Sequence, residues 1–93
     1  MIRSFGDRDT ERLWRRERVP SMDPRIQRAG LRKLRQLGSA KSIEDLRAVP
    51  SNRLERLKGP RSGQYSIRIN NQWRICFQWH DAGAEEVEIV DYH

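Results

Sequence analysis

The sequence predicts an α+β domain in which two N-terminal helices pack on one face of a small, mainly antiparallel sheet. Before Pro50, apolar residues recur at helical spacing between capping signals. After it, bulky and polar residues alternate with a period of two. Of the 93 residues, 35% are hydrophobic, which suffices for one core, so residues 1–93 are expected to form a single domain.

The first helix is expected after a short strand at residues 2–5. Asp7 or Asp9 can cap its N-terminus, because a side-chain oxygen there accepts hydrogen bonds from the first unpaired backbone N–H groups. The helix should run to about Arg18, and Pro20 should stop it.

The second helix is expected to begin at Pro24, because Asp23 is a capping acid and proline fits the first helical position. Gly38 is its expected C-terminal cap, and residues 42–46 should form a further helical turn or a tight loop. The apolar side chains of this helix share one face: Ile26, Ala29, Leu34 and Leu37.

Extended chain is expected at residues 53–58, followed by a polar loop at residues 59–63. Two half-buried strands come next, one around Ile67 and the other around Ile75. Both put their bulky side chains on one face only if their connection has an odd length. Residues 70–72 should therefore form a three-residue hairpin loop, with Asn in the left-handed position.

A turn at residues 81–83 should lead to a last strand, in which Val87 and Ile89 face the core. The hairpin register places the outward Arg68 opposite Arg74, although like charges facing each other across strands are unfavourable. A phosphate bound between the two guanidinium groups would explain the pair. Side chains that splay apart into water would also accommodate it at little cost.

The charge of the chain favours a polyanionic partner. Net charge is +6 and 16 of the 19 basic residues are Arg, whose planar group binds phosphate bidentately and stacks on bases. A genome-wide preference for arginine codons would explain the helical arginines equally well. Cys76, the single cysteine, is expected to be a small buried residue, which excludes a disulfide framework.

No metal, cofactor or membrane span is expected. Two histidines are too few for a protein-only transition-metal site, and no Cys/His cluster has zinc spacing. No apolar run is long enough to cross a bilayer, and the N-terminus lacks a signal-peptide core, so the cytoplasm is the expected compartment.

The chain ends in Asp91, Tyr92 and His93, three proton-transfer groups in a row. A carboxylate can orient an imidazole, an imidazole titrates near neutral pH, and a phenol can donate to a developing negative charge. The triplet suits general acid–base catalysis, although a frayed polar terminus could have the same composition.

Several motifs together resemble the HigB branch of the RelE-like toxins, also called the killer-protein family. The similarity covers nearly the whole chain, and its Leu-Lys-Gly, Asn-x-Trp-Arg and terminal Asp-Tyr-His elements are specific in this order. The matching segments are residues 2–5, 40–42, 45–46, 53–59, 63–67, 71–77 and 90–93.

The resemblance implies a RelE-like microbial ribonuclease fold and the toxin of a bacterial type II toxin–antitoxin pair. Such a toxin enters the ribosomal 30S A site and cuts the mRNA, which blocks translation. A helix-turn-helix antitoxin similar to HigA would hold it in check, and operator DNA would be contacted only through that antitoxin.

The resemblance also implies which residues form the RNA-binding and cleavage site. Glu55 departs from the family pattern, since many members carry a His there, and we assign it with Arg61 and Arg68 to RNA binding. The residues that match family positions for phosphate binding or cleavage are Lys58, Arg74, Asp91, Tyr92 and His93.

Attack of a ribose 2′-oxygen on the adjacent phosphorus needs a base, donors for the phosphate oxygens and an acid, and no metal is obligatory. His93, oriented by Asp91, is the expected proton-transfer group, and Glu55 is an alternative base. Tyr92 could stack on a base or donate to phosphate. The phosphate donors would be Lys58, Arg68 and Arg74.

Two other functions remain compatible with parts of the sequence. A non-catalytic toxin of the same fold could inhibit a protein such as DNA gyrase, but it would not need the terminal triplet. A basic RNA-binding accessory protein would need only charge and aromatic residues. Whether mRNA is cleaved or merely bound separates these functions.

Overall fold

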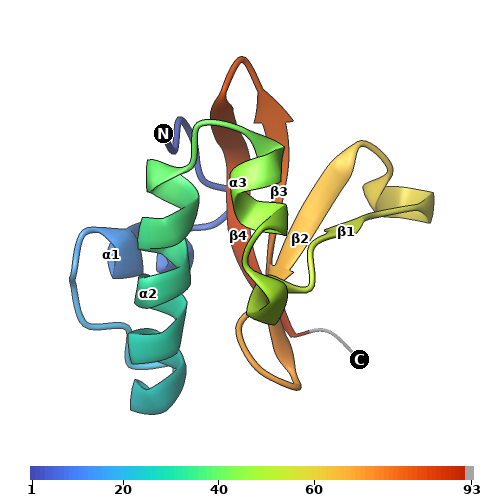
Figure 1. Cartoon of the computed structure of the whole chain (residues 1–93). Coiled ribbons are helices and arrows are strands. Elements are labelled where there is room, and N and C mark those ends of the chain that lie inside the picture. Colours follow the sequence, from blue (N-terminus) through green and yellow to red (C-terminus); the bar gives the residue numbers. More distant parts are fainter. Residues whose placement is uncertain (92–93) are drawn as a thin grey trace.

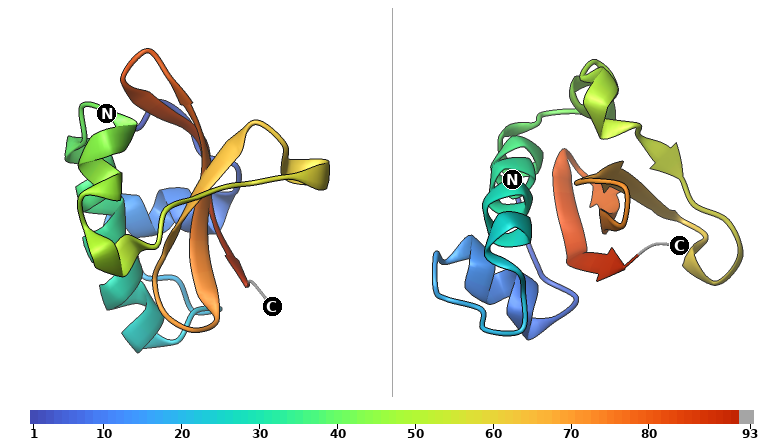
Figure 2. Two further views of the ribbon diagram at one scale, coloured as in Figure 1. Left: turned by 45° about the vertical axis from the view of Figure 1, so that its right-hand side comes forward. Right: turned by 90° about the horizontal axis from the view of Figure 1, so that it is seen from below.

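The computed structural model describes residues 1–91 and has the predicted α+β architecture (Figure 1). Within these residues, a four-stranded antiparallel sheet follows the chain in the order β1-β2-β3-β4. Helices α1 and α2 lie on one side of the sheet, and β1 is the edge strand on the side of the molecule away from them (Figure 2). The strands are β1 (Glu55–Arg56), β2 (Gln64–Arg68), β3 (Trp73–His80) and β4 (Gly83–Asp91).

The helices cover the sheet face that carries the alternating bulky side chains. Leu34 and Leu37 of the second helix belong to one core cluster with Ile67, Ile75 and Phe77 of the sheet, and all five are fully buried. The helical elements are α1 (Arg8–Trp14), α2 (Pro24–Ser39), α3 (Ile43–Arg47) and the 3₁₀ turns η1 (Pro50–Asn52) and η2 (Gly59–Arg61).

Helix α1 is capped by Asp7, as predicted, but the expectation that it runs to about Arg18 was wrong. Arg16 adopts a left-handed φ of 63°, and its N–H donates to the Leu13 carbonyl at 2.9 Å. This backbone turn ends the helix in the manner of a Schellman motif, and it does so before Pro20 is reached.

Helix α2 begins as predicted, with the Asp23 side chain accepting a hydrogen bond from the Arg25 backbone N–H at 2.7 Å. Gly38 does not cap it, because the helix continues to Ser39. A Cβ atom at Gly38 would lie 2.9 Å from the indole of Trp14. The glycine therefore permits α1 and α2 to pack closely instead of ending the helix.

The β2–β3 hairpin has the predicted three-residue loop and register, with Ile67 opposite Ile75. The expected left-handed Asn was wrong, since neither Asn70 nor Asn71 has a positive φ. Instead, the Asn70 side-chain oxygen accepts the backbone N–H groups of Gln72 and Trp73, each at 2.8 Å. The side chain thus replaces the backbone geometry that the turn would otherwise need.

Val87 and Ile89 of the last strand, β4, face the core, as predicted. It contains a β-bulge that the alternating pattern did not predict, where the pairing with β3 shifts between Cys76 and Gln78. Glu86 at the bulge has a φ of 54°. Residues 2–5 form only isolated parallel bridges alongside this strand, not a regular strand.

The β3–β4 turn contains two left-handed residues, Asp81 (φ 48°) and Ala82 (φ 60°), between the paired His80 and Gly83. This is the conformation of a two-residue type I′ hairpin, which normally favours glycine at its second position. The Arg3 guanidinium donates to the carbonyls of His80 and Asp81 at 2.8 and 2.6 Å, which holds the turn in place.

We expect Ala82→Gly to raise the free energy of unfolding by about 0.5–1 kcal/mol, because glycine relieves the left-handed strain at a smaller entropic cost. Urea denaturation measures the change. Ala48, with a φ of −66°, is the matched control, and Gly there should lower stability. A destabilised Ala82→Gly variant would contradict the left-handed turn.

Candidate active site

The sheet face away from α1 and α2 carries the side chains predicted to bind phosphate. Strand β1 lies on the side of the molecule away from both helices (Figure 2). Arg68 and Arg74 are directly paired across β2 and β3, as predicted. The hairpin therefore brings both guanidinium groups to one end of the open face.

Arg74 is not splayed into water as the sequence allowed, because its side chain is only 8% exposed. Its Nε donates to the Ser66 hydroxyl at 2.8 Å, and its Nη2 donates to the Arg53 carbonyl at 2.6 Å and the Ser66 carbonyl at 3.2 Å. Three hydrogen bonds, two of them buried and one partly buried, hold the guanidinium plane in one orientation, so Arg74 is a fixed cation rather than a mobile surface charge.

Glu55 lies next to this cation. Its Oε1 is 3.9 Å from Arg74 Nη1, and its side chain is 51% exposed. The pair is therefore open to water on the Glu55 side, where solvent weakens the attraction. A carboxylate in this place partly neutralises the arginine and lies within reach of any group that binds there.

A hollow of about 300 Å³ opens between these side chains. Arg68 is held at its edge, where Nε donates to the Asn70 carbonyl at 3.1 Å and Nη2 donates to the Asn71 side chain. Three arginines around one hollow form a basic depression suited to an anion. The lining residues are Arg53, Glu55, Arg68, Asn70, Asn71 and Arg74.

The end of β4 lies at the same end of the sheet. Asp91 pairs with Trp73, and Val90 pairs with Arg74. The Asp91 carboxylate accepts a hydrogen bond of 3.1 Å from the Gln72 side chain. Strand pairing thus places Asp91 at the same end of the sheet as the arginine pair, with the parity of Trp73. The predicted catalytic residues Tyr92 and His93 lie outside the described residues.

Lys58 and Arg61 are not gathered into this hollow. They line a separate depression of about 290 Å³ with Leu57 and Pro60, at the turn after β1. Arg61 Nη1 donates to Glu88 at 2.6 Å across the sheet. Lys58 is exposed. The predicted cations therefore form two groups, one at Arg74 and one at the turn.

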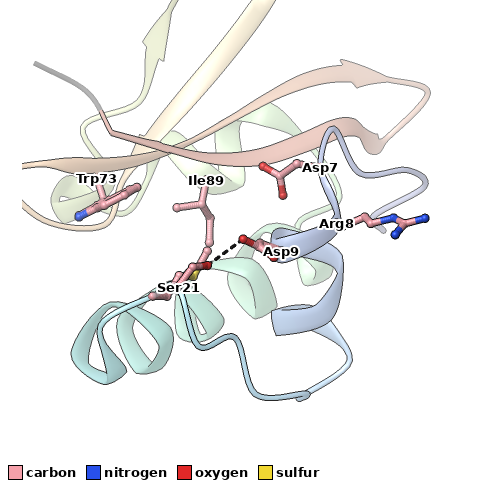
Figure 3. A pocket seen from close by; sticks show the side chains of 7 residues that line it. Asp7, Arg8, Asp9, Ser21, Trp73 and Ile89 are labelled. Atoms are coloured by element: carbon pink, nitrogen blue, oxygen red, sulfur yellow. Dashed lines mark hydrogen bonds between the residues drawn. The ribbon is translucent and has the colours of Figure 1, made fainter.

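A larger hollow of about 370 Å³ lies on the helical side, between α1 and the sheet (Figure 3). Its polar groups are bonded locally, with Ser21 donating to Asp9 at 2.9 Å and Asp7 capping the helix. Trp73 and Ile89 supply its apolar wall. It faces away from Arg74 and takes no part in the candidate site.

Residues 3–93 match the family described as the RelE-like toxin of the type II toxin–antitoxin system HigB. The chain belongs to the HigB-like toxin family. It is 39% identical over 85 residues to Toxin HigB-1 of Vibrio cholerae, which covers 90% of each chain. It is 32% identical over 96 residues to Endoribonuclease HigB of Proteus vulgaris, covering all of both chains.

Solved structures agree with this toxin fold. The YoeB-YefM complex from Staphylococcus aureus contains a chain similar to this one, with a TM-score of 0.62 at 15% identity, covering 100% of this chain and 98% of that chain. A heterotetrameric YoeB-YefM complex from the same organism gives a TM-score of 0.55 at 17% identity, with the same coverage of each chain. The predicted RelE-like fold is confirmed.

The predicted family and the predicted role as toxin of a type II system are also confirmed, and an antitoxin is the partner that such a system implies. The endoribonuclease prediction agrees with the name of the Proteus relative. In the part of the toxin that the structure describes, no helix is long and apolar enough to cross a membrane.

Sequence reasoning missed two groups of the toxin site, the Ser66 hydroxyl and the Arg53 carbonyl. Ser66 could have been found from the register, because it lies on the same face as Arg68 and is diagonal to Arg74. The Arg53 carbonyl could not, because it depends on a left-handed residue (φ 42°) in an irregular segment.

The cysteine of the toxin supplies no reactive thiol to this face. Cys76 is fully buried, as predicted, and burial raises the pKa of its thiol, which keeps it protonated and poorly nucleophilic. Between Met1 and Asp91, no group of three or more His, Cys, Asp or Glu side chains could hold a metal ion. The available chemistry of this region is that of arginine and carboxylate side chains.

Proposed function

We propose that this toxin is a ribosome-dependent endoribonuclease that cuts mRNA in the 30S A site and so blocks translation in the cytoplasm. The observation that carries the proposal is the fixed Arg74 guanidinium, 8% exposed, beside a basic hollow at the sheet end where β4 reaches Asp91. A rigid cation costs no reorganisation when charge develops on a phosphate.

In the proposed reaction, a ribose 2′-oxygen attacks the adjacent phosphorus and the 5′-oxygen leaves. Arg74 and Arg68 stabilise the charge on the phosphate oxygens. His93 transfers the proton and Asp91 orients it, while Tyr92 stacks on a base or donates to phosphate.

The remaining predicted residues have supporting roles. Lys58 and Arg61, at the turn after β1, contact the RNA backbone to one side of the cut. Glu55 contacts the RNA beside Arg74, and its exposed carboxylate is the alternative base. The ribosome supplies the rest of the substrate alignment, because positioning can account for about 7–11 kcal/mol of a barrier.

Primer extension on an mRNA after induction of the toxin tests this function. New 5′ ends within the coding region are expected, and they should disappear when translation initiation on that mRNA is blocked. Intact transcripts in growth-arrested cells, together with lost DNA supercoiling, would favour inhibition of gyrase instead. Bound but uncut mRNA would favour the RNA-binding accessory protein.

We further propose that the antitoxin is a helix-turn-helix protein similar to HigA and that operator DNA is contacted only through it. Helices α1 and α2 present exposed arginines on the side away from Arg74, and an acidic segment could dock there without entering the hollow. The exposed arginines on and next to these helices include Arg12, Arg15, Arg16, Arg28, Arg32 and Arg35.

Reversing two of these charges, with Arg28→Glu and Arg32→Glu together, should weaken the complex more than about tenfold at modest salt, because like charges then face each other. Titration of the toxin with the neighbouring small helix-turn-helix protein measures this affinity. Glu substitution at Arg47, in α3, is the control. If His93→Gln abolished the affinity and the α2 double variant kept it, the antitoxin would bind at the catalytic end of the sheet, which would contradict docking on α1 and α2.

A further inference from the structure

The hydrogen bonds of Arg74 use one particular edge of its guanidinium group. Nε and Nη2 form the edge that contacts Ser66 and the Arg53 carbonyl, at 2.6–3.2 Å. Nη1 lies toward Glu55. Because the group is planar and rigid, fixing the first edge also fixes the direction in which Nη1 points.

Ser66 lies where it can hold that edge. It is paired with Cys76 on β3 and with Glu55 on β1, so the Arg74 side chain reaches it diagonally from β3 to β2. Ser66 is fully buried, and its hydroxyl provides an acceptor beneath the arginine. A hydroxyl removed from water binds a guanidinium more strongly than an exposed one does.

The Arg53 backbone holds the other end of the same edge. Arg53 ends the turn η1 with φ 42° and ψ 54°, a left-handed conformation in which its carbonyl accepts from Arg74 Nη2 at 2.6 Å. Leaving a buried carbonyl or hydroxyl without its donor is costly. Ser66 and the Arg53 carbonyl therefore keep Arg74 in place whether or not an anion is bound.

We propose that Ser66 is a positioning residue for RNA cleavage, because it turns the Arg74 guanidinium so that its Nη1 side meets the scissile phosphate beside Glu55. Ser66 itself does not touch RNA. The inference rests on the proposed role of Arg74 as a phosphate-binding group. Under this inference, catalysis depends on the direction in which the Arg74 guanidinium points, and not on its charge alone.

Ser66→Ala removes the hydroxyl with little change in volume and tests the inference. In a reconstituted translation system, we expect the maximal single-turnover cleavage rate to fall on the order of 10- to 100-fold. The toxin concentration that gives half of this rate should stay the same, because binding and charge are retained. Ser66→Thr should restore the rate, and Ser39→Ala, at the end of α2, is the matched control.

Two further measurements separate positioning from a loss of folding. In NMR spectra of the free toxin, the Arg74 Nε–H should be protected from exchange in the parent and in Ser66→Thr, and exposed in Ser66→Ala. On an Arg74→Lys background, Ser66→Ala should lower the rate no further, because it acts through the guanidinium.

A parental cleavage rate in Ser66→Ala, or an equal loss on both backgrounds, would overturn the inference. Unchanged exchange of the Arg74 Nε–H in Ser66→Ala would overturn it as well. Absence of cleavage by the parent toxin would contradict the proposed function instead, and the exchange measurement would still test whether Ser66 orients Arg74.

Discussion

Deleting His93 is expected to lower mRNA cleavage by about 10²–10⁴-fold, which is the contribution of a general acid–base group. His93→Gln, which keeps the length of the chain and removes the titrating ring, should give the same loss. The fold should persist, because a terminal residue contributes little burial. The fraction of mRNA cut in a translating extract measures the effect, and circular dichroism checks folding.

The other histidine provides a matched control. His80 is exposed at the end of β3 next to the β3–β4 turn, at the opposite end of the strand from Arg74, and His80→Gln should leave cleavage unchanged. A folded toxin that still cuts mRNA at the parental rate without His93 would remove this residue from the mechanism and would favour Glu55 as the base.

Arg74→Ala is expected to have two effects. Cleavage should fall by about 10²–10³-fold, the usual loss when a preorganised donor to developing charge is removed. The free energy of unfolding should fall by about 1–3 kcal/mol, because the buried Ser66 hydroxyl and the Arg53 carbonyl lose their donor. Single-turnover cleavage and urea denaturation measure the two effects separately.

Arg74→Lys should keep more of both properties, since an ammonium retains the charge but cannot span the three acceptors as a planar guanidinium does. Arg47→Ala is the control, because this side chain is 57% exposed and pairs only locally, with Glu44. Parental cleavage and stability in Arg74→Ala would contradict both the structural and the catalytic role.

The sheet could be predicted from the sequence because alternation and loop length are strong local constraints. An odd loop at residues 70–72 puts the bulky side chains of both strands on one face, and this register alone places Arg68 opposite Arg74. The face of a strand residue follows from such parity. The burial of its side chain does not follow from parity, and the sequence therefore predicted Arg74 at the surface.

The features that could not be predicted depend on contacts between distant segments. Arg74 is buried because a serine on β2 and a carbonyl after η1 both reach it. Gly38 continues its helix because the Trp14 ring needs the space. Arg16 ends α1 in a conformation that arginine rarely adopts. In each case, tertiary packing overrode a reasonable local preference.

The central claim is tested most directly by mapping both ends of the cut in a purified translation system programmed with one mRNA. With ribosomes stalled at a defined codon, the toxin should cut within the A-site codon and leave a 2′,3′-cyclic phosphate upstream and a 5′-hydroxyl downstream. The same mRNA without ribosomes should stay intact. Cleavage that does not depend on ribosomes, or uncut mRNA on stalled ribosomes at saturating toxin, would contradict the account.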